Sequence, residues 1–369
     1  MNNDLKIKIY GEDTTNLFLA FLLLKSGFKV KISKNYNISK KTKEKYFFIS
    51  NSSKLLLDNF NLWSQLKNKA CSIESLIVTD TSFTNEIDLT IRDFNFIKPN
   101  TINIGWILDE CDFYNLLLNE ISKFNNVFCE SSFNGNFEMK DSYINLISNL
   151  IEKFFKRIFK LIFSKNNNSS IEFTASLRGF INNRYYSIIS ENGLTLLCPI
   201  NKNLFRVKWI IKKSLLARTL TIGKSFLLDN LSTILPKELK IDEIHGDLDI
   251  TPANPDMFQR PSKNSHLIIN KGSVKLLNLS LKDLNLSFND VIYIYNHIRS
   301  IDFKNVKEYF LLKFKFFIYF KLKISSVFYG FYKLNIHSSY FFKKIIFYLV
   351  KKVRIIRKFI LKFIILNFY

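Results

Sequence analysis

Glycine is scarce in this chain, with 10 residues among 369. Soluble domains carry about 7% glycine on average, so the chain has fewer than half of the usual number. Loops that wrap a phosphate group need glycines, because only glycine lets the backbone come that close. Functions built on several such loops are therefore disfavoured. With 47% hydrophobic and 15% aromatic residues, the chain is not a disordered protein either.

Cysteine is also scarce, and its spacing excludes two classes of protein. The chain contains Cys71, Cys111, Cys129 and Cys198, with no C-x-x-C pair and no histidine pair nearby. A zinc module and a secreted disulfide framework both need closer spacing, so we expect a protein of the reducing cytoplasm. The first residues, MNNDLKIKIYGED, do not place an apolar segment after a basic one, so we expect no signal peptide.

Long uncharged apolar runs are absent, since none reaches the ~18 residues that cross a bilayer. Positive charge gathers at the C-terminal end instead. Residues 301–369 hold 15 Lys and Arg against two acidic residues, which accounts for +13 of the net charge of +23. Apolar positions at helical spacing share one side of this segment: Ile345, Ile346, Leu349, Val353 and Ile356.

This pattern predicts a basic amphipathic helical tail over residues 301–369 that lies on an anionic membrane surface. The alternative is a helix packed on its own domain with a solvated basic face. A nucleic-acid partner is not expected, because the cations alternate with Phe and Ile instead of forming a polar stripe.

The N-terminal residues predict a strand, a helix and a second strand. Residues 6–10 and 28–32 alternate as strands, and residues 17–25 form a leucine-rich helical run between Gly11 and Gly27. Such a βαβ unit is common to α/β domains. In its more specific form it binds a dinucleotide at the start of the helix, where free N–H groups attract a diphosphate.

The glycine fingerprint of a dinucleotide site is mostly missing. The spacing GxGxxG falls on GEDTTN, with Gly11 at the first position, Asp13 at the second and Asn16 at the third. The Asp13 carboxylate would repel a diphosphate at this point. The acidic residue that holds a ribose after the second strand is replaced by Ser33 and Lys34.

Downstream, helical and strand-like segments alternate. We expect a serine-rich turn and a helix within 51–68, a strand followed by a helix from 105, a helix over 144–163 and a loop over 165–170. Short alternating segments between 171 and 250 predict an antiparallel sheet with strands at 185–189, 195–200 and 204–210, and residues 274–286 predict a helix.

The predicted fold class is therefore α/β, with a Rossmann-like FAD/NAD(P)-binding core interrupted by an antiparallel β-rich substrate domain. The expected domains are the core at 1–170, the β-rich insert at 171–250, a return to the core at 251–300, and the basic tail at 301–369.

Four stretches in this order resemble the FAD-dependent aromatic hydroxylases of ubiquinone biosynthesis, which have the para-hydroxybenzoate hydroxylase fold. The first is the N-terminal βαβ unit. The others are ISNSSKLLLDNFNLWSQL (49–66), GWILDECDFYNLLLNEI (105–121) and SENGLTLLCPINKNLFRVKW (190–209). The segment 277–283, LNLSLKD, is similar to the end of a further flavin motif of that family.

The resemblance implies a monooxygenase that uses FAD, with NAD(P)H as electron donor, to hydroxylate a polyprenylated phenol or quinone precursor. It also implies a place on the inner face of the membrane beside other ubiquinone-biosynthesis proteins. The family motifs assign cofactor contacts to Gly11, Ser169, Asn278 and Asp283. They assign no catalytic residue and no metal.

The chain departs from the family where glycine should contact the flavin. Lys165-Asn166 stands in place of Asp-Gly, Lys263-Asn264 in place of Gly-Asp, and Val274-Lys275-Leu276 in place of Gly-Gln-Gly. Two hypotheses therefore stay open: an active FAD-dependent monooxygenase, and a flavin-free pseudoenzyme that serves as a membrane-associated binding or scaffold protein.

Two other groups of polar residues suggest weaker sites. His245 lies among Asp242, Glu243, Asp247 and Asp249, but acid-rich segments are usually solvated and a metal is not expected. His266 follows Ser265 without the strand-to-helix turn of a nucleophile elbow, so a surface turn is the better interpretation.

Overall fold

The computed structural model describes residues 6–10, 13–33, 46–81, 86–90, 103–130, 168–178, 183–190, 193–201, 203–236, 239–252, 267–270, 273–276, 288, 291–292, 294–296, 298–299, 348–349 and 351–353. The chain forms two compact units, each assembled from three stretches of sequence. Unit 1 takes residues 1–43, 113–166 and 258–328, and unit 2 takes residues 44–112, 167–257 and 329–369. The predicted α/β class is confirmed, whereas the predicted domain boundaries stay a prediction.

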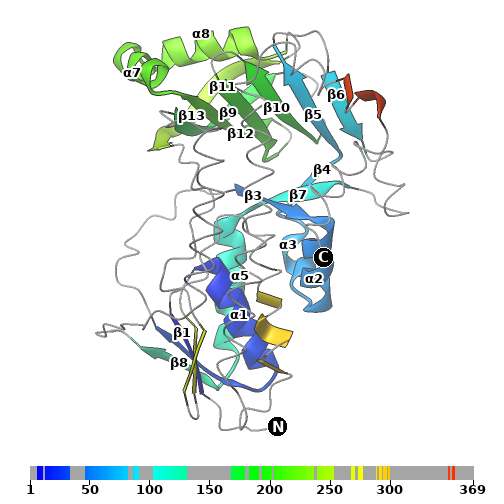
Figure 1. The fold of residues 1–369 in the computed structure, drawn as a ribbon, viewed down its shortest axis with the longest axis vertical. Coiled ribbons are helices and arrows are strands. Elements are labelled where there is room, and N and C mark those ends of the chain that lie inside the picture. The colour runs from blue at the N-terminus through cyan, green and yellow to red at the C-terminus, as the bar shows by residue number, and fades with distance from the viewer. Residues whose placement is uncertain are drawn as a thin grey trace, which may run out of the picture. The chain divides into compact units, whose positions relative to one another are not determined.

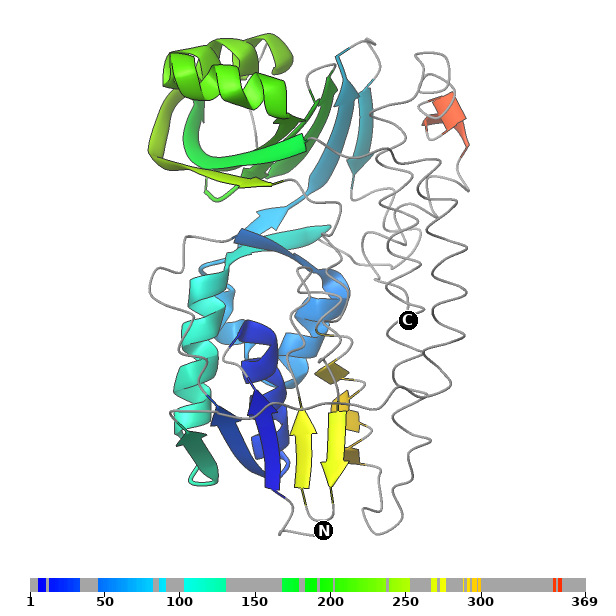
Figure 2. The same cartoon turned by 60° about the vertical axis from the view of Figure 1, so that its left-hand side comes forward.

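Unit 1 contains a five-stranded sheet in the order β14-β15-β1-β2-β8. Its strands are β1 (Lys6–Tyr10), β2 (Lys29–Ser33), β8 (Val127–Glu130), β14 (Leu267–Asn270) and β15 (Ser273–Leu276). All neighbours are parallel except β14 and β15, which form an antiparallel pair. Helix α1 (Thr14–Lys25) connects β1 to β2 and lies along the sheet, as Figure 2 shows. The predicted βαβ unit is therefore confirmed.

Helix α1 is buried on all sides from Thr14 to Leu24, which explains why its sequence is apolar all round. Three aromatic rings form a contact triangle beside it. Phe18 lies 4.9 Å from Phe288 and 6.1 Å from Phe113, and Phe113 lies 5.6 Å from Phe288, measured between ring centroids. Phe113 belongs to α5 (Glu110–Ser122), the helix predicted after residue 105. These ring contacts anchor α1 to the neighbouring elements of unit 1.

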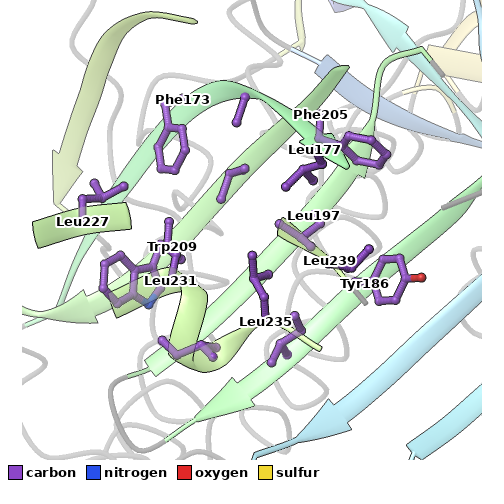
Figure 3. Close-up of a cluster of buried hydrophobic side chains, with 14 of the residues drawn as sticks. Phe173, Leu177, Tyr186, Leu197, Phe205, Trp209, Leu227, Leu231, Leu235 and Leu239 are labelled. Atoms are coloured by element: carbon purple, nitrogen blue, oxygen red, sulfur yellow. The ribbon is translucent and has the colours of Figure 1, made fainter. Parts of the chain in front are cut away.

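Unit 2 is dominated by a seven-stranded sheet in the order β13-β9-β12-β11-β10-β5-β6. Its strands are β5 (Ser75–Asp80), β6 (Glu86–Thr90), β9 (Asn168–Arg178), β10 (Arg184–Ser190), β11 (Gly193–Pro199), β12 (Leu204–Lys212) and β13 (Lys240–Pro252). Helices α7 (Lys213–Ile222) and α8 (Lys224–Ile234) cover one face of it (Figure 1). Apolar side chains of the sheet and of α8, among them Trp209, Phe173 and Leu231, fill the space between them (Figure 3).

The opposite face of this sheet packs in part on a three-stranded sheet of the same unit, β3 (Tyr46–Ser50), β7 (Gly105–Asp109) and β4 (Cys71–Ile73). Ile107 of β7, Leu89 of β6 and Leu194 of β11 belong to the shared apolar cluster. The segment predicted as one helix after a turn forms two helices, α2 (Asn51–Asn59) and α3 (Trp63–Leu66), separated at Asn61, whose φ is 61°.

Two sequence-based predictions are wrong. Asn168, Ser169 and Ser170 were expected in a loop but are the first residues of β9, where they pair with β12. Residues 274–276 were expected to be helical but belong to β15, because they pair with β1. The pattern also gave no sign of α7 and α8.

Some predictions lie outside the described residues. These are the helix at 144–163 and most of the tail at 301–369, of which the structure describes 348–349 and 351–353. Residues 348–349 and 351–352 are helical, with the Val353 N–H donating to the Leu349 carbonyl at 2.7 Å. None of the helices in the described ranges has the length and apolar character to cross a bilayer.

Candidate cofactor site at the start of helix α1

The start of α1 is the point where a Rossmann-type unit holds the diphosphate of a dinucleotide. Strands β1 and β2 are parallel neighbours, and α1 begins at Thr14 after β1 ends at Tyr10. The first N–H groups of α1 therefore lie at the carboxyl edge of the sheet, where the helix dipole favours negative charge. This backbone arrangement fits the diphosphate half of FAD.

One side chain at this position opposes a diphosphate. Asp13 is the N-cap of α1, in an extended conformation with φ −67° and ψ 160°. Its Oδ1 accepts the backbone N–H of Asn16 at 3.0 Å, and its Oδ2 accepts the Asn16 Nδ2 amide at 2.8 Å. The carboxylate therefore occupies the first turn of the helix and carries the same charge sign as the ligand.

Asp13 and Asn16 were identified in the sequence only as departures from the glycine fingerprint. They are three residues apart, which is the spacing of an N-cap residue and the N3 residue that hydrogen-bonds to it. This spacing is a local sequence signal for such capping. Thr14, Thr15 and Asn16 are all buried, with exposed fractions of 3%, 4% and 2%. The first turn of α1 is thus buried in the protein, and its Asn16 N–H is already bonded to Asp13.

Of the four residues that the family motifs assign to the cofactor, Ser169 alone is among the described residues. Gly11, Asn278 and Asp283 lie outside the described residues. Ser169 is in β9, where its backbone pairs with Ile211 and Pro252 in the seven-stranded sheet of unit 2. Their roles stay predictions from the resemblance.

The acidic segment around His245 forms part of strand β13 and is engaged in ion pairs. Asp242 accepts from Arg178 Nε at 2.6 Å, and Asp249 Oδ2 lies 3.3 Å from Arg206 Nη2. His266, the other histidine singled out in the sequence, lies outside the described residues. The carboxylates of Asp242 and Asp249 therefore form ion pairs between strands of the sheet.

Arg206 belongs to a charged strip on the sheet face opposite α7 and α8. Its guanidinium also donates to Thr174 Oγ1 at 3.3 Å and lies 3.9 Å from Glu172 Oε2, which in turn is the partner of Lys208 Nζ through Oε1 at 2.6 Å. The strip contains two cations and two anions, so its charges balance and it offers no net charge to a ligand.

Three cysteines described in the structure, Cys71, Cys111 and Cys198, are free thiols. Burial raises the pKa of the Cys198 thiol far above its usual range, and the neighbouring Cys71 adds to the rise. Burial also raises the pKa of Cys71. Because the thiolate is the reactive form, these two cysteines are poor nucleophiles.

No protein-family model matches the sequence, and no curated protein is similar enough to it to count as a match. Solved structures do match the fold. The PqsL of Pseudomonas aeruginosa in complex with 2-aminobenzoylacetate superposes with a TM-score of 0.58 at 12% identity, over 88% of this chain and 94% of PqsL. Another PqsL structure is described as that of a probable FAD-dependent monooxygenase.

Two further structures cover almost the whole chain. The p-nitrophenol 4-monooxygenase PnpA of Pseudomonas putida DLL-E4 gives a TM-score of 0.59 at 10% identity, over 96% of each chain. The HpxO of Klebsiella pneumoniae, solved with FAD, gives 0.57 at 9% identity, over 98% of this chain and 99% of HpxO. The fold of this chain is therefore that of the FAD-dependent monooxygenases.

Proposed function

We propose that this chain is an FAD-dependent monooxygenase that hydroxylates a polyprenylated phenol or quinone precursor in ubiquinone biosynthesis. The observation that carries the proposal is the extent of the structural match. It covers 94% to 99% of enzymes such as PqsL, PnpA and HpxO, and so includes both compact units. A chain that had kept only a nucleotide-binding unit would match a much smaller part of them.

The chemistry would come mainly from the cofactor. FAD, when bound, would supply the oxygenation chemistry, with O₂ as the source of the oxygen atom and NAD(P)H as the source of electrons. The protein's part is to hold FAD at the βαβ unit through the start of α1 and to keep water away from the reacting centre.

The membrane is the source of substrate in this proposal, and the basic segment 301–369 is the docking element. Its described residues support that role, because Tyr348 is 62% exposed and Lys351 and Lys352 are exposed nearby. An aromatic ring beside lysines suits the boundary between lipid headgroups and water. Docking would place the protein on the cytoplasmic face of the membrane.

A second candidate function is that of a flavin-free binding or scaffold protein with the same fold. The capping of α1 by Asp13 favours it, because the carboxylate takes the N–H group that a diphosphate would use. Such a protein would hold the phenol at the membrane, or hold another enzyme of the pathway there, without oxidising it.

The absorption spectrum of the purified protein separates the two candidates. An active monooxygenase is expected to show flavin absorption, or to gain it when FAD is added, and to consume NAD(P)H when a polyprenylated phenol is supplied. A colourless protein that takes up no added FAD would exclude the enzyme and leave the scaffold.

Membrane docking needs its own test with the full-length chain. Changing Lys351, Lys352, Arg354 and Arg357 to Gln should weaken binding to vesicles that contain anionic lipid, measured by co-sedimentation. The matched control changes four exposed or partly exposed lysines elsewhere to Gln: Lys67, Lys69, Lys123 and Lys240. Equal binding by the two variants would contradict docking through the tail.

A further inference from the structure

We infer that the Asp13 carboxylate stands in the place of the FAD diphosphate and sets a low affinity for FAD, so that the cofactor binds reversibly. This inference rests on the proposed monooxygenase function. It concerns a residue that the fold itself does not require, because a glycine at this position is what the dinucleotide fingerprint provides.

The first step of the argument is geometric. Both oxygens of Asp13 are used, one by the Asn16 backbone N–H at 3.0 Å and one by the Asn16 side-chain amide at 2.8 Å. Two hydrogen bonds to one partner fix the orientation of the carboxylate over the first turn. A diphosphate can reach the Asn16 N–H only after Asp13 has rotated away and lost both bonds.

The second step is electrostatic. The start of a helix carries a partial positive charge equivalent to about half a proton charge. A full negative charge on Asp13 is larger than this partial charge, so α1 attracts a diphosphate less than the same helix start with glycine at position 13 would. Asp13 is partly buried, and Thr14, Thr15 and Asn16 beside it are buried, so water screens this repulsion less than it would at a fully exposed carboxylate.

The third step is the choice of a variant that separates charge from structure. Asn is as good an N-cap residue as Asp, so Asp13→Asn removes the charge and keeps an acceptor for the Asn16 backbone N–H, while its NH₂ group gives up the bond from Asn16 Nδ2. Asp13→Gly supplies the residue of the dinucleotide fingerprint. Asp58→Asn is the matched control, because it removes one carboxylate from helix α2, where Asp58 pairs with Lys54.

The experiment is a titration of each full-length protein with FAD, followed by flavin fluorescence, and a parallel titration with riboflavin, which has no phosphate. Thermal unfolding of the flavin-free proteins shows that each variant is folded. We expect Asp13→Asn and Asp13→Gly to bind FAD about tenfold more tightly or better than the natural chain. Asp58→Asn should match the natural chain, and riboflavin affinity should not change in any variant.

The other outcomes are distinguishable. If the natural chain binds FAD and Asp13→Asn binds it with the same affinity, the role of Asp13 is wrong while the proposed function stands. An equal gain for riboflavin would also overturn it, since the effect would then be one of space and not of charge. If neither the natural chain nor any variant binds FAD, the proposed function fails together with this inference.

Discussion

At the scale of single residues, Gly193 occupies a position that leaves no room for a side chain. It begins β11 with φ at +138°, and a Cβ added there would lie 1.9 Å from the Ile210 carbonyl oxygen. Gly27, which follows α1, also has a positive φ of 85° but has nothing within 4 Å of an added Cβ. The two glycines share a positive φ, and they differ in the space available to a side chain.

Gly193→Ala should therefore lower the free energy of unfolding by about 2 kcal/mol or more, since it adds a steric clash to the strained backbone. Gly27→Ala should cost only about 1 kcal/mol, from the backbone alone. Urea unfolding followed by circular dichroism measures both. Equal losses would show that β11 can move away from Ile210 without cost.

Cys198 allows a chemical test at the same scale. Burial raises the pKa of its thiol, so almost none of it is thiolate at pH 8. We expect iodoacetamide to modify Cys198 at least about tenfold more slowly than Cys111 in the folded protein, and at a similar rate in urea. Peptide mass spectrometry at timed intervals measures this. Fast modification of Cys198 in the folded state would mean that this end of β11 opens readily.

At the scale of secondary-structure elements, the charged strip joins β9, β12 and β13. Arg206 of β12 has an exposed side-chain fraction of 13% and contacts residues of both β9 and β13, whereas Arg178, which pairs with Asp242, is 81% exposed. Removing the Arg206 cation takes a counter-charge away from the partly buried Asp249, whereas Glu172 keeps its pair with Lys208. An exposed pair loses little, because water replaces the partner.

Arg206→Ala should lower the free energy of unfolding by about 1 to 3 kcal/mol, and Arg178→Ala by less than about 0.5 kcal/mol. The same urea experiment compares the two. If both variants unfold like the natural chain, the strip contributes nothing to joining the three strands.

Some strands and helices could be predicted from the sequence, and others could not. Strand β1, helix α1 and strand β2 were predicted within a few residues, because their apolar periodicity is local. Residues 274–276 were assigned to a helix as part of the apolar stretch 274–286, and for these three residues only the pairing with β1 decides between helix and strand. The strand at 168–170 is polar and was missed for the same reason.

Part of the candidate site could be predicted from the sequence. The position of a diphosphate at the start of α1 follows from the βαβ pattern, and Asp13 was identified as a residue that opposes it. That Asp13 is held by two hydrogen bonds from Asn16 depends on the conformation of both side chains, which a motif alignment does not represent.

At the scale of the whole molecule, strands far apart in the sequence are neighbours in one sheet. Ile7 of β1 is in register with Val274 of β15, so the first strand of the chain has a neighbour about 260 residues away. Strand β15 is itself internal, between β14 and β1. Proline at an internal strand position removes a ladder hydrogen bond.

Val274→Pro should therefore lower the free energy of unfolding of the full-length protein by about 3 kcal/mol or cause it to aggregate. Circular dichroism and size-exclusion chromatography measure the two effects. A monomeric variant of natural stability would mean that β1 does not depend on β15.

The pairing of β1 with β15 also affects how the protein is made. At about 5 to 20 residues per second, the ribosome needs roughly 13 to 50 s to synthesise the residues between these strands. For that time β1 has an edge with no partner from its own chain, and such edges bind other strands. Slow synthesis or a shortage of chaperones should therefore reduce the yield of this protein before it changes the stability of the finished molecule.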